Sequence, residues 1–249
     1  MKIGVLPDVQ ARPGDDFTFL SRVGYYFAEK KPDKIVCVGD FGDMPSLSSY
    51  DIGKRDFEGR RIKKDIKAVH EAMQAFMFPL IIAREEEGYD PDLIMLGGNH
   101  DFDRIERATN EDSRLDGLIS IDDLGYADWG WRCYPFLEVV TIGGVAFSHY
   151  LTSGVMGRPI TTSAALLSKR HMSTVVGHQQ GLQMSTAVRA DGRMLTGIIA
   201  GSCYEHKEKY LGPQGNKHFR GLLMLHDVRD GEFEPMPVTL SYLKQRRYA

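Results

Sequence analysis

The stretch Leu93-Ile-Met-Leu-Gly-Gly-Asn99 is a short apolar run that ends at a side chain able to bind a metal ion. A continuous apolar run is typical of a strand buried on both faces, and sheets covered by helices bind ligands beyond the carboxyl ends of their strands. Four other runs end in the same way; they are Ile3-Gly-Val-Leu-Pro-Asp8, Ile35-Val-Cys-Val-Gly-Asp40, Val145-Ala-Phe-Ser-His149 and Thr174-Val-Val-Gly-His178. If the five strands share one sheet, two Asp, one Asn and two His meet at one place. The pattern therefore predicts a metal site.

The composition is that of an ordinary globular chain. Its 249 residues could form one large domain or two small ones, and we expect a single domain over residues 1–249. A net charge of −3 offers no basic field for long nucleic acids. No apolar run approaches the roughly 18 to 20 residues that span a bilayer, so no membrane partner is expected. The three cysteines lack Cys-x-x-Cys spacing, which favours reduced thiols and a cytoplasmic location.

The first half of the chain alternates strand and helix patterns. Strands are expected at residues 2–7, 35–38 and 93–96. A helix is expected at about 15–30, and apolar residues at 3.6-residue spacing predict a second, longer helix at about 57–87. The order strand, helix, strand, helix, strand indicates a parallel sheet with right-handed crossovers.

The second half carries three signals of β-hairpins. Each is a two-residue turn sequence between segments of strand character. The three turns are Gly143-Gly144, Asp191-Gly192 and Asp230-Gly231. Hairpins add antiparallel strands, so we expect an α/β fold with two packed mixed sheets and helices outside.

Four long polar segments are expected to connect these elements. Loops of this kind carry many of the substrate contacts in enzymes. The segments span residues 44–57, 101–135, 150–165 and 201–218.

The metal-binding candidates lie in motifs that follow one another in a specific order. They are Asp8-Val9-Gln10, Gly39-Asp40-Phe41-Gly42-Asp43, Gly98-Asn99-His100-Asp101, His149 and Gly177-His178-Gln179-Gln180. This set resembles the calcineurin-like metallophosphoesterase superfamily, whose pattern is Asp-x-His, Gly-Asp-x-x-Asp, Gly-Asn-His-Asp/Glu, His and Gly-His-x-His. The resemblance implies a four-layer α/β/β/α sandwich. The segments Met44-Pro-Ser-Leu-Ser-Ser-Tyr50 and Tyr210-Leu-Gly-Pro-Gln-Gly215 also look like those of phage-encoded members, which would place the protein in the host cytoplasm.

The resemblance also assigns metal ligands. It implies that Asp40 bridges two divalent ions, that Asp8 joins it on the first ion, and that Asn99, His149 and His178 hold the second. Two such ions share a water, lower its pKa and aim the hydroxide at phosphorus. Alone, each Asp or Asn could be a turn residue and each His a core residue. The complete set favours ligation.

Three further residues receive roles from the same resemblance. His100 would act as the general acid for the leaving alkoxide or contact a phosphate oxygen, and Asp101 would fix its tautomer and orientation. We expect Asp43 to orient the site through hydrogen bonds to the groups around it.

The chain departs from the superfamily pattern at Gln10 and Gln180. Both stand where histidine ligands of the first ion are expected. An amide oxygen is harder and less basic than imidazole and suits Mg²⁺ or Mn²⁺ better than Zn²⁺. The two glutamines could bind the ion, hydrogen-bond a ligating water, or fill space left by an abandoned site. We therefore expect a weaker first site and two divalent ions, with Mn²⁺ ahead of Mg²⁺, Zn²⁺, Fe and Ni²⁺.

The motifs also narrow the substrate. Protein Ser/Thr phosphatases of the superfamily carry an Arg after Gly-Asp-x-x-Asp and another before Gly-Asn-His-Glu, and both clamp phosphate. Here Met44 and Gly97 occupy those positions, so a phosphoprotein substrate is disfavoured. The Asn-His-Asp form is similar to that of phosphodiesterases and nucleases. We expect a metal-dependent phosphodiesterase acting on a small phosphodiester or nucleotide by attack of a metal-bound hydroxide, with a monoester as the alternative.

Two other functions stay open. The altered first site could leave a catalytically weak or dead binding or scaffold module, although such a module has no reason to keep His100 and Asp101. The protein could also be a DNA or RNA nuclease, although it lacks a basic stripe.

Several basic residues outside the motifs lie in expected loops, where they could contact a phosphate or remain at the surface. They are Arg12, Arg104, Arg158, His206 and His218.

Overall fold

Residues 1–208 and 212–246 are described by a computed structural model of the chain. The larger of two main sheets has the strand order β13-β12-β1-β2-β3-β4. Its strands are β1 (Ile3–Leu6), β2 (Lys34–Cys37), β3 (Asp92–Leu96), β4 (Arg132–Tyr134), β12 (Gly221–Arg229) and β13 (Glu232–Thr239). Strands β1 to β4 are parallel neighbours, whereas β12 is antiparallel to both β1 and β13.

The second sheet has five strands in the order β10-β11-β9-β6-β5. They are β5 (Val140–Ile142), β6 (Val145–Ser148), β9 (Thr174–Val176), β10 (Leu182–Val188) and β11 (Met194–Ala200). Strand β9 is parallel to β6 and β11, and the hairpins β5–β6, β10–β11 and β12–β13 confirm the three predicted turns. The five strands that end at candidate metal ligands belong to two sheets, so the expectation of one shared sheet was wrong.

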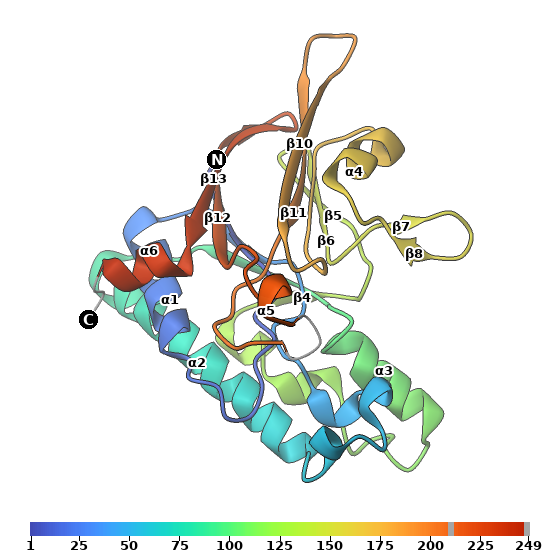
Figure 1. The fold of residues 1–249 in the computed structure, drawn as a ribbon. Coiled ribbons are helices and arrows are strands. Elements are labelled where there is room, and N and C mark those ends of the chain that lie inside the picture. The colour runs from blue at the N-terminus through green and yellow to red at the C-terminus, as the bar shows by residue number, and fades with distance from the viewer. Residues whose placement is uncertain (209–211, 247–249) are drawn as a thin grey trace.

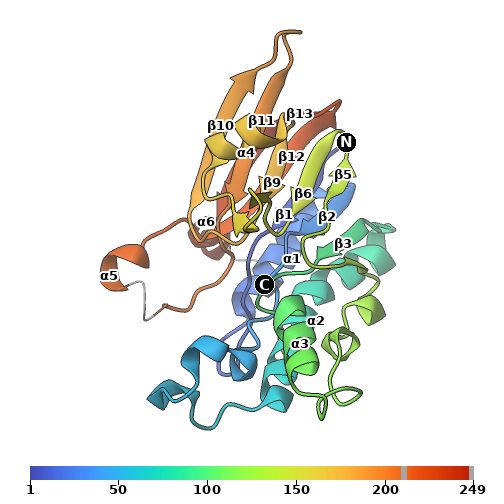
Figure 2. The same cartoon turned by 90° about the vertical axis from the view of Figure 1, so that its right-hand side faces the viewer.

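Helices cover the outer face of each sheet. On the first sheet lie α1 (Thr18–Lys30), α2 (Ile62–Glu87) and α6 (Leu240–Gln245), and on the second lies α4 (Ser163–Arg170) (Figures 1 and 2). One buried hydrophobic cluster lies between the first sheet and its helices α1, α2 and α6. A second fills the space between the two sheets, and a third lies under α4. The fold is therefore the expected four-layer sandwich.

The long helix α2 shows how the apolar spacing is used. Val69, Met73 and Phe76 are fully buried against the first sheet and α1, as the 3.6-residue spacing predicts. The helix begins at Ile62 rather than near residue 57, because residues 55–57 form a separate 3₁₀ turn. By length and composition α2 could cross a membrane, but half of its most apolar window is buried inside the protein, as in a core helix.

The expectation that residues 101–135 form a long connection was wrong in large part. They contain α3 (Phe102–Glu111) and the strand β4. The Asp101 carboxylate accepts the backbone N–H of Phe102 and so caps the helix. Only a narrow face of α3 is buried, at Phe102, Arg104 and Ile105, so its sequence resembles a polar loop.

The other three expected connections hold short elements. Residues 44–57 form three 3₁₀ turns, and residues 150–165 include β7 (Thr152–Ser153), β8 (Arg158–Pro159) and the start of α4. The late segment, residues 201–218, includes α5 (Gly212–Gly215). Its Tyr210 and Leu211, part of the phage-like stretch, lie outside the described residues.

Candidate metal centre

The carboxyl ends of strands from both sheets meet at one place. His149, which follows β6, lies with its Nδ1 2.8 Å from the carbonyl oxygen of Val38, which follows β2. The backbone N–H of His178, after β9, donates to the Asp8 Oδ1 after β1 at 3.1 Å. The structure therefore brings the five strand-end side chains together, as the sequence predicts.

Four of these side chains form the tightest group. The Oδ1 atom of Asn99 lies 2.8 Å from His149 Nε2 and 2.7 Å from His178 Nδ1. Ligand atoms of Asp40, His149 and His178 all lie within 4.8 Å of one another. His149 must carry a hydrogen on Nδ1, because Nδ1 faces a carbonyl oxygen. In the neutral ring, its Nε2, the Asn99 oxygen and the Asp40 carboxylate converge as acceptors, an arrangement that fits a cation. Without an ion, the raised pKa of His149 puts a proton on Nε2 in that place.

Asp8 gives an independent sign of a cation. Its side chain is fully buried, and its Oδ2 has no hydrogen-bond partner within the described residues. Burial is the main reason why the pKa of Asp8 is raised to about 7, with His149 opposing the shift. A buried carboxylate oxygen without a donor is costly unless a positive charge faces it. The chemistry of this group therefore fits a divalent ion.

The remaining pKa shifts follow from close packing of opposite and like charges. Burial opposes the charged form of Asp40, but the His149 and His100 charges hold its pKa below the usual range. Burial lowers the pKa of His149, but the Asp40 carboxylate raises it to about 9. The pKa of His178 is lowered to about 4 by burial and by the neighbouring His149. A divalent ion would supply the positive charge that these carboxylates otherwise draw from a proton.

Two motif glycines allow this close approach. A Cβ atom at Gly98 would overlap the backbone nitrogen and the carboxylate of Asp40, and one at Gly177 would press on Asp8 Oδ1. Glycine is therefore required here by space.

His100 is paired with Asp43. Its Nδ1 lies 2.6 Å from Asp43 Oδ1, and its Nε2 lies 3.9 Å from Asp40 Oδ2. Burial lowers the pKa of His100, but the Asp40 charge and the Asp43 hydrogen bond raise it above its usual value. Arg12 Nε lies 3.2 Å from Asp43 Oδ2, and Arg104 donates to the Asp43 side chain and carbonyl oxygen. Arg12 Nη2 also donates to Glu208, so both arginines are held by carboxylates of the protein.

Asp101 does not have the role expected for it. Its carboxylate accepts backbone N–H groups of Gly98 and Phe102 at 2.8 Å each and of Phe41 at 3.1 Å. It therefore ties the Asp40 loop to the Asn99 loop. The reason is geometric: Asp101 caps α3 and points under the loops, whereas Asp43 reaches His100 Nδ1. The expectation that Asp101 orients His100 was wrong.

A pocket of about 470 Å³ opens beside these residues, and it is lined by His100, His178, Gln179, Gln180, Gly181, Gly215 and His218. We call Asn99, His149 and His178 the histidine half of the centre, and Asp8, Gln10 and Gln180 the glutamine half. Gln10 is buried, and its backbone N–H donates to the Asp40 carbonyl oxygen at 2.8 Å.

Gln180 is held by a residue that sequence reasoning missed. The hydroxyl of Tyr204 donates to Gln180 Oε1. Tyr204 and His218 both lie in the late segment. The sequence predicted substrate contacts for this segment as a whole and did not single out Tyr204. Tyr204 belongs to no recognisable sequence motif, so its contact with Gln180 can be found only from the fold.

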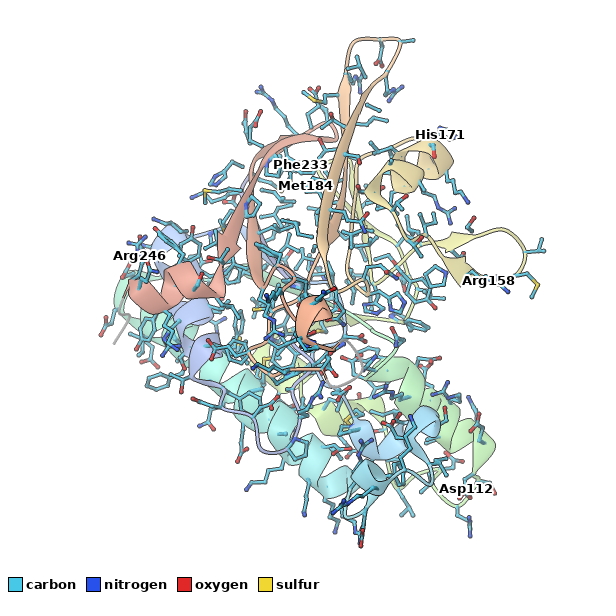
Figure 3. All side chains as sticks on the ribbon, viewed as in Figure 1. Asp112, Arg158, His171, Met184, Phe233 and Arg246 are labelled. Carbon is cyan, nitrogen blue, oxygen red and sulfur yellow. The ribbon has the colours of Figure 1, made fainter. Side chains whose placement is uncertain are left out.

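The other candidate residues lie elsewhere. His206 stacks on Tyr204, with ring centroids 4.0 Å apart, and lies between the carboxylates of Asp15 and Glu208. Arg158 is exposed on the β7–β8 hairpin, which projects away from the sandwich (Figure 3).

Comparison with known proteins identifies the class. The profile of the family "Calcineurin-like phosphoesterase" matches residues 1–179. The chain therefore belongs to this family, and it is a metal-dependent phosphoesterase by class. The family implies divalent metal ions in a dinuclear site.

The curated relatives are phage proteins. Gene 54 protein of Mycobacterium phage D29 is 33% identical over 198 residues, which cover 74% of this chain and 72% of that protein. Gene 54 protein of Mycobacterium phage L5 is 33% identical over 100 residues, 40% of this chain and 36% of that protein. These relatives support a phage origin.

Solved structures of phosphoesterases are also similar. Yfce, a phosphoesterase from E. coli, is 14% identical over 96% of this chain and 100% of its own, with a TM-score of 0.40. A dimetal phosphatase from Danio rerio is 12% identical over 96% and 99%, with a TM-score of 0.43.

Proposed function

We propose that this protein hydrolyses small phosphodiesters or nucleotides in the host cytoplasm, with two divalent ions of which Mn²⁺ is the first candidate. The observation that carries the proposal is the His100–Asp43 pair on the wall of a pocket that also contains His178. The proposed proton donor and a candidate metal ligand thus line the same pocket, which supports ester hydrolysis.

The residues would divide the work between the two halves. Asn99, His149 and His178 with Asp40 would hold one ion, and Asp8 with Asp40 and Gln10 would hold the other more weakly. When bound, such ions activate a water and neutralise phosphate oxygens. His100 would keep a proton on Nε2, facing the pocket, and give it to the leaving alkoxide while Nδ1–H donates to Asp43.

The charge of the pocket supports a diester. Among the described residues that line it, none is Lys or Arg. The nearby Arg104 is held by Asp43, and Arg12 by Asp43 and Glu208. A phosphodiester carries one negative charge, whereas a monoester carries up to two near neutral pH. A pocket whose described lining has no Lys or Arg to pair with a second negative charge therefore suits the diester better.

The test is hydrolysis of bis-p-nitrophenyl phosphate and p-nitrophenyl phosphate across Mn²⁺, Mg²⁺, Zn²⁺, Fe²⁺ and Ni²⁺. We expect Mn²⁺-stimulated turnover with the diester preferred, and no turnover after EDTA treatment. Silence on every ester with every metal would favour a scaffold module instead. Metal counting over graded Mn²⁺ checks the weaker site, because two equally tight Zn²⁺ ions would contradict it.

A further inference from the structure

Gln180 is the member of the glutamine half with the best-defined surroundings. It lies two positions beyond His178, between β9 and β10, and lines the pocket. Its Oε1 accepts a hydrogen bond from the hydroxyl of the fully buried Tyr204. The Tyr204 segment is itself fixed, because the neighbouring Cys203 N–H donates to the Asp8 carbonyl oxygen at 2.8 Å.

The direction of this hydrogen bond follows from its neighbours. His218 Nδ1 lies 2.8 Å from the carbonyl oxygen of Gly215, which can only accept, so Nδ1 carries the hydrogen. His218 Nε2 is then an acceptor in the neutral ring, and the Ser202 hydroxyl lies 3.0 Å from it. The Tyr204 hydroxyl lies 3.3 Å from the same Nε2 atom, farther than the Ser202 hydroxyl. Ser202 is therefore the better donor to Nε2, and the Tyr204 hydroxyl donates to Gln180.

The consequence is that the amide of Gln180 presents its nitrogen. The oxygen, which is the atom that could bind a cation, already uses one of its two lone pairs to accept from Tyr204. The NH₂ group donates two hydrogens and cannot bind a cation. No other side-chain partner of Gln180 is found within residues 1–208 and 212–246.

We propose that Gln180 binds the substrate rather than a metal ion. Its Nε2 donates to a non-bridging oxygen of the phosphate ester, and Tyr204 is the positioning residue that fixes the amide. The pocket supports this, since it contains both Gln180 and His100 and has neutral donors among its described lining residues. The inference rests on the proposed function, because it assumes that a phosphate occupies this pocket.

The experiment compares wild type with Gln180→Ala, Tyr204→Phe and the control Gln74→Ala, which lies on the exposed face of α2. For each Mn²⁺-loaded protein, bound metal is counted by elemental analysis, binding of inorganic phosphate is measured by calorimetry, and kcat and KM are measured on bis-p-nitrophenyl phosphate. We expect Gln180→Ala to weaken phosphate binding and raise KM about tenfold, with kcat within about threefold of wild type. The Mn²⁺ count should stay unchanged, and Tyr204→Phe should show a smaller effect of the same kind.

Each other outcome has a defined meaning. Loss of one Mn²⁺ equivalent in Gln180→Ala would show that Gln180 is a metal ligand and would overturn the inference. Unchanged phosphate binding in both Gln180→Ala and Tyr204→Phe would overturn it as well. A wild-type protein that binds no phosphate would also overturn it. A wild type that binds phosphate but cleaves no ester would refute the proposed function alone, and the phosphate affinities would still decide the role of Gln180.

Discussion

The histidine half and the glutamine half of the centre are built in different ways. The histidine half consists of three side chains that touch one another directly at strand ends, with Asn99 Oδ1 within 2.8 Å of both imidazoles. In the glutamine half, Gln180 is held from outside by Tyr204 of the late segment. The first arrangement is set by backbone geometry. The second depends on a partner far along the chain. If Gln180 binds substrate as proposed, changes there would alter substrate recognition and leave the proposed ion site intact.

The largest expected effect comes from the histidine half. His149→Ala removes a proposed metal ligand that is fully buried and hydrogen-bonded to the carbonyl oxygen of Val38. We expect kcat to fall by at least about a thousandfold and one Mn²⁺ equivalent to be lost. Steady-state kinetics with metal analysis measures both. The control is His70→Ala at an exposed position of α2, which should keep the kcat and the Mn²⁺ content of wild type.

Asp43→Asn tests the acid rather than the ions. Asp43 accepts from His100 Nδ1, and an amide there holds the imidazolium less well. We expect kcat to fall about 10- to 100-fold with KM little changed. The Mn²⁺ count should remain that of wild type. A fall in metal content as large as that of His149→Ala would mean that Asp43 belongs to the ion site. The proposed separation between the general acid and the ion site would then be wrong.

Asp101→Asn should act on folding. The Asp101 carboxylate accepts backbone N–H groups from both loops, and the NH₂ of Asn would face at least one donor. We expect the free energy of unfolding to fall by about 1–3 kcal/mol. Urea denaturation measures the loss, and kcat of the folded variant should stay within about threefold of wild type. A loss of kcat equal to that of Asp43→Asn, without loss of stability, would restore Asp101 as the partner of His100.

The same contrast explains how much could be predicted from the sequence. The strand-end residues Asp8, Asp40 and His149 are local to buried runs, and their convergence follows from strands ending at a common edge. Which carboxylate contacts His100 depends on where α3 begins, so motif position alone favoured Asp101 over Asp43. The alternating strand and helix patterns and the three turn sequences predicted two packed mixed sheets with helices outside, which are the four layers of the fold.

The contacts of the late segment were beyond sequence reasoning. Tyr204 reaches Gln180 only because residue 202 forms a bridge with Asp8 and brings two distant parts of the chain together. Similarly, α3 and β4 were missed because short elements with little buried surface have polar sequences. Long-range pairing of this kind leaves no periodicity in the chain.

The smallest expected effect concerns the pH dependence of stability in the late segment. Burial lowers the pKa of His206, but its hydrogen bonds to Asp15 and Glu208 raise it more, against the opposing charge of Arg12. The folded state therefore binds this proton more tightly than the unfolded state, whose pKa is about 6.5. The resulting stability is fully present below that value and is lost as pH rises through the higher folded pKa. We expect wild type to lose stability just above about pH 6.5 and His206→Gln to show a flatter profile, with a difference of at most about 1 kcal/mol. Urea denaturation from pH 5.5 to 8.5 measures the free energy of unfolding of both proteins. Parallel pH profiles would show that protonation of His206 does not stabilise the segment that carries Tyr204.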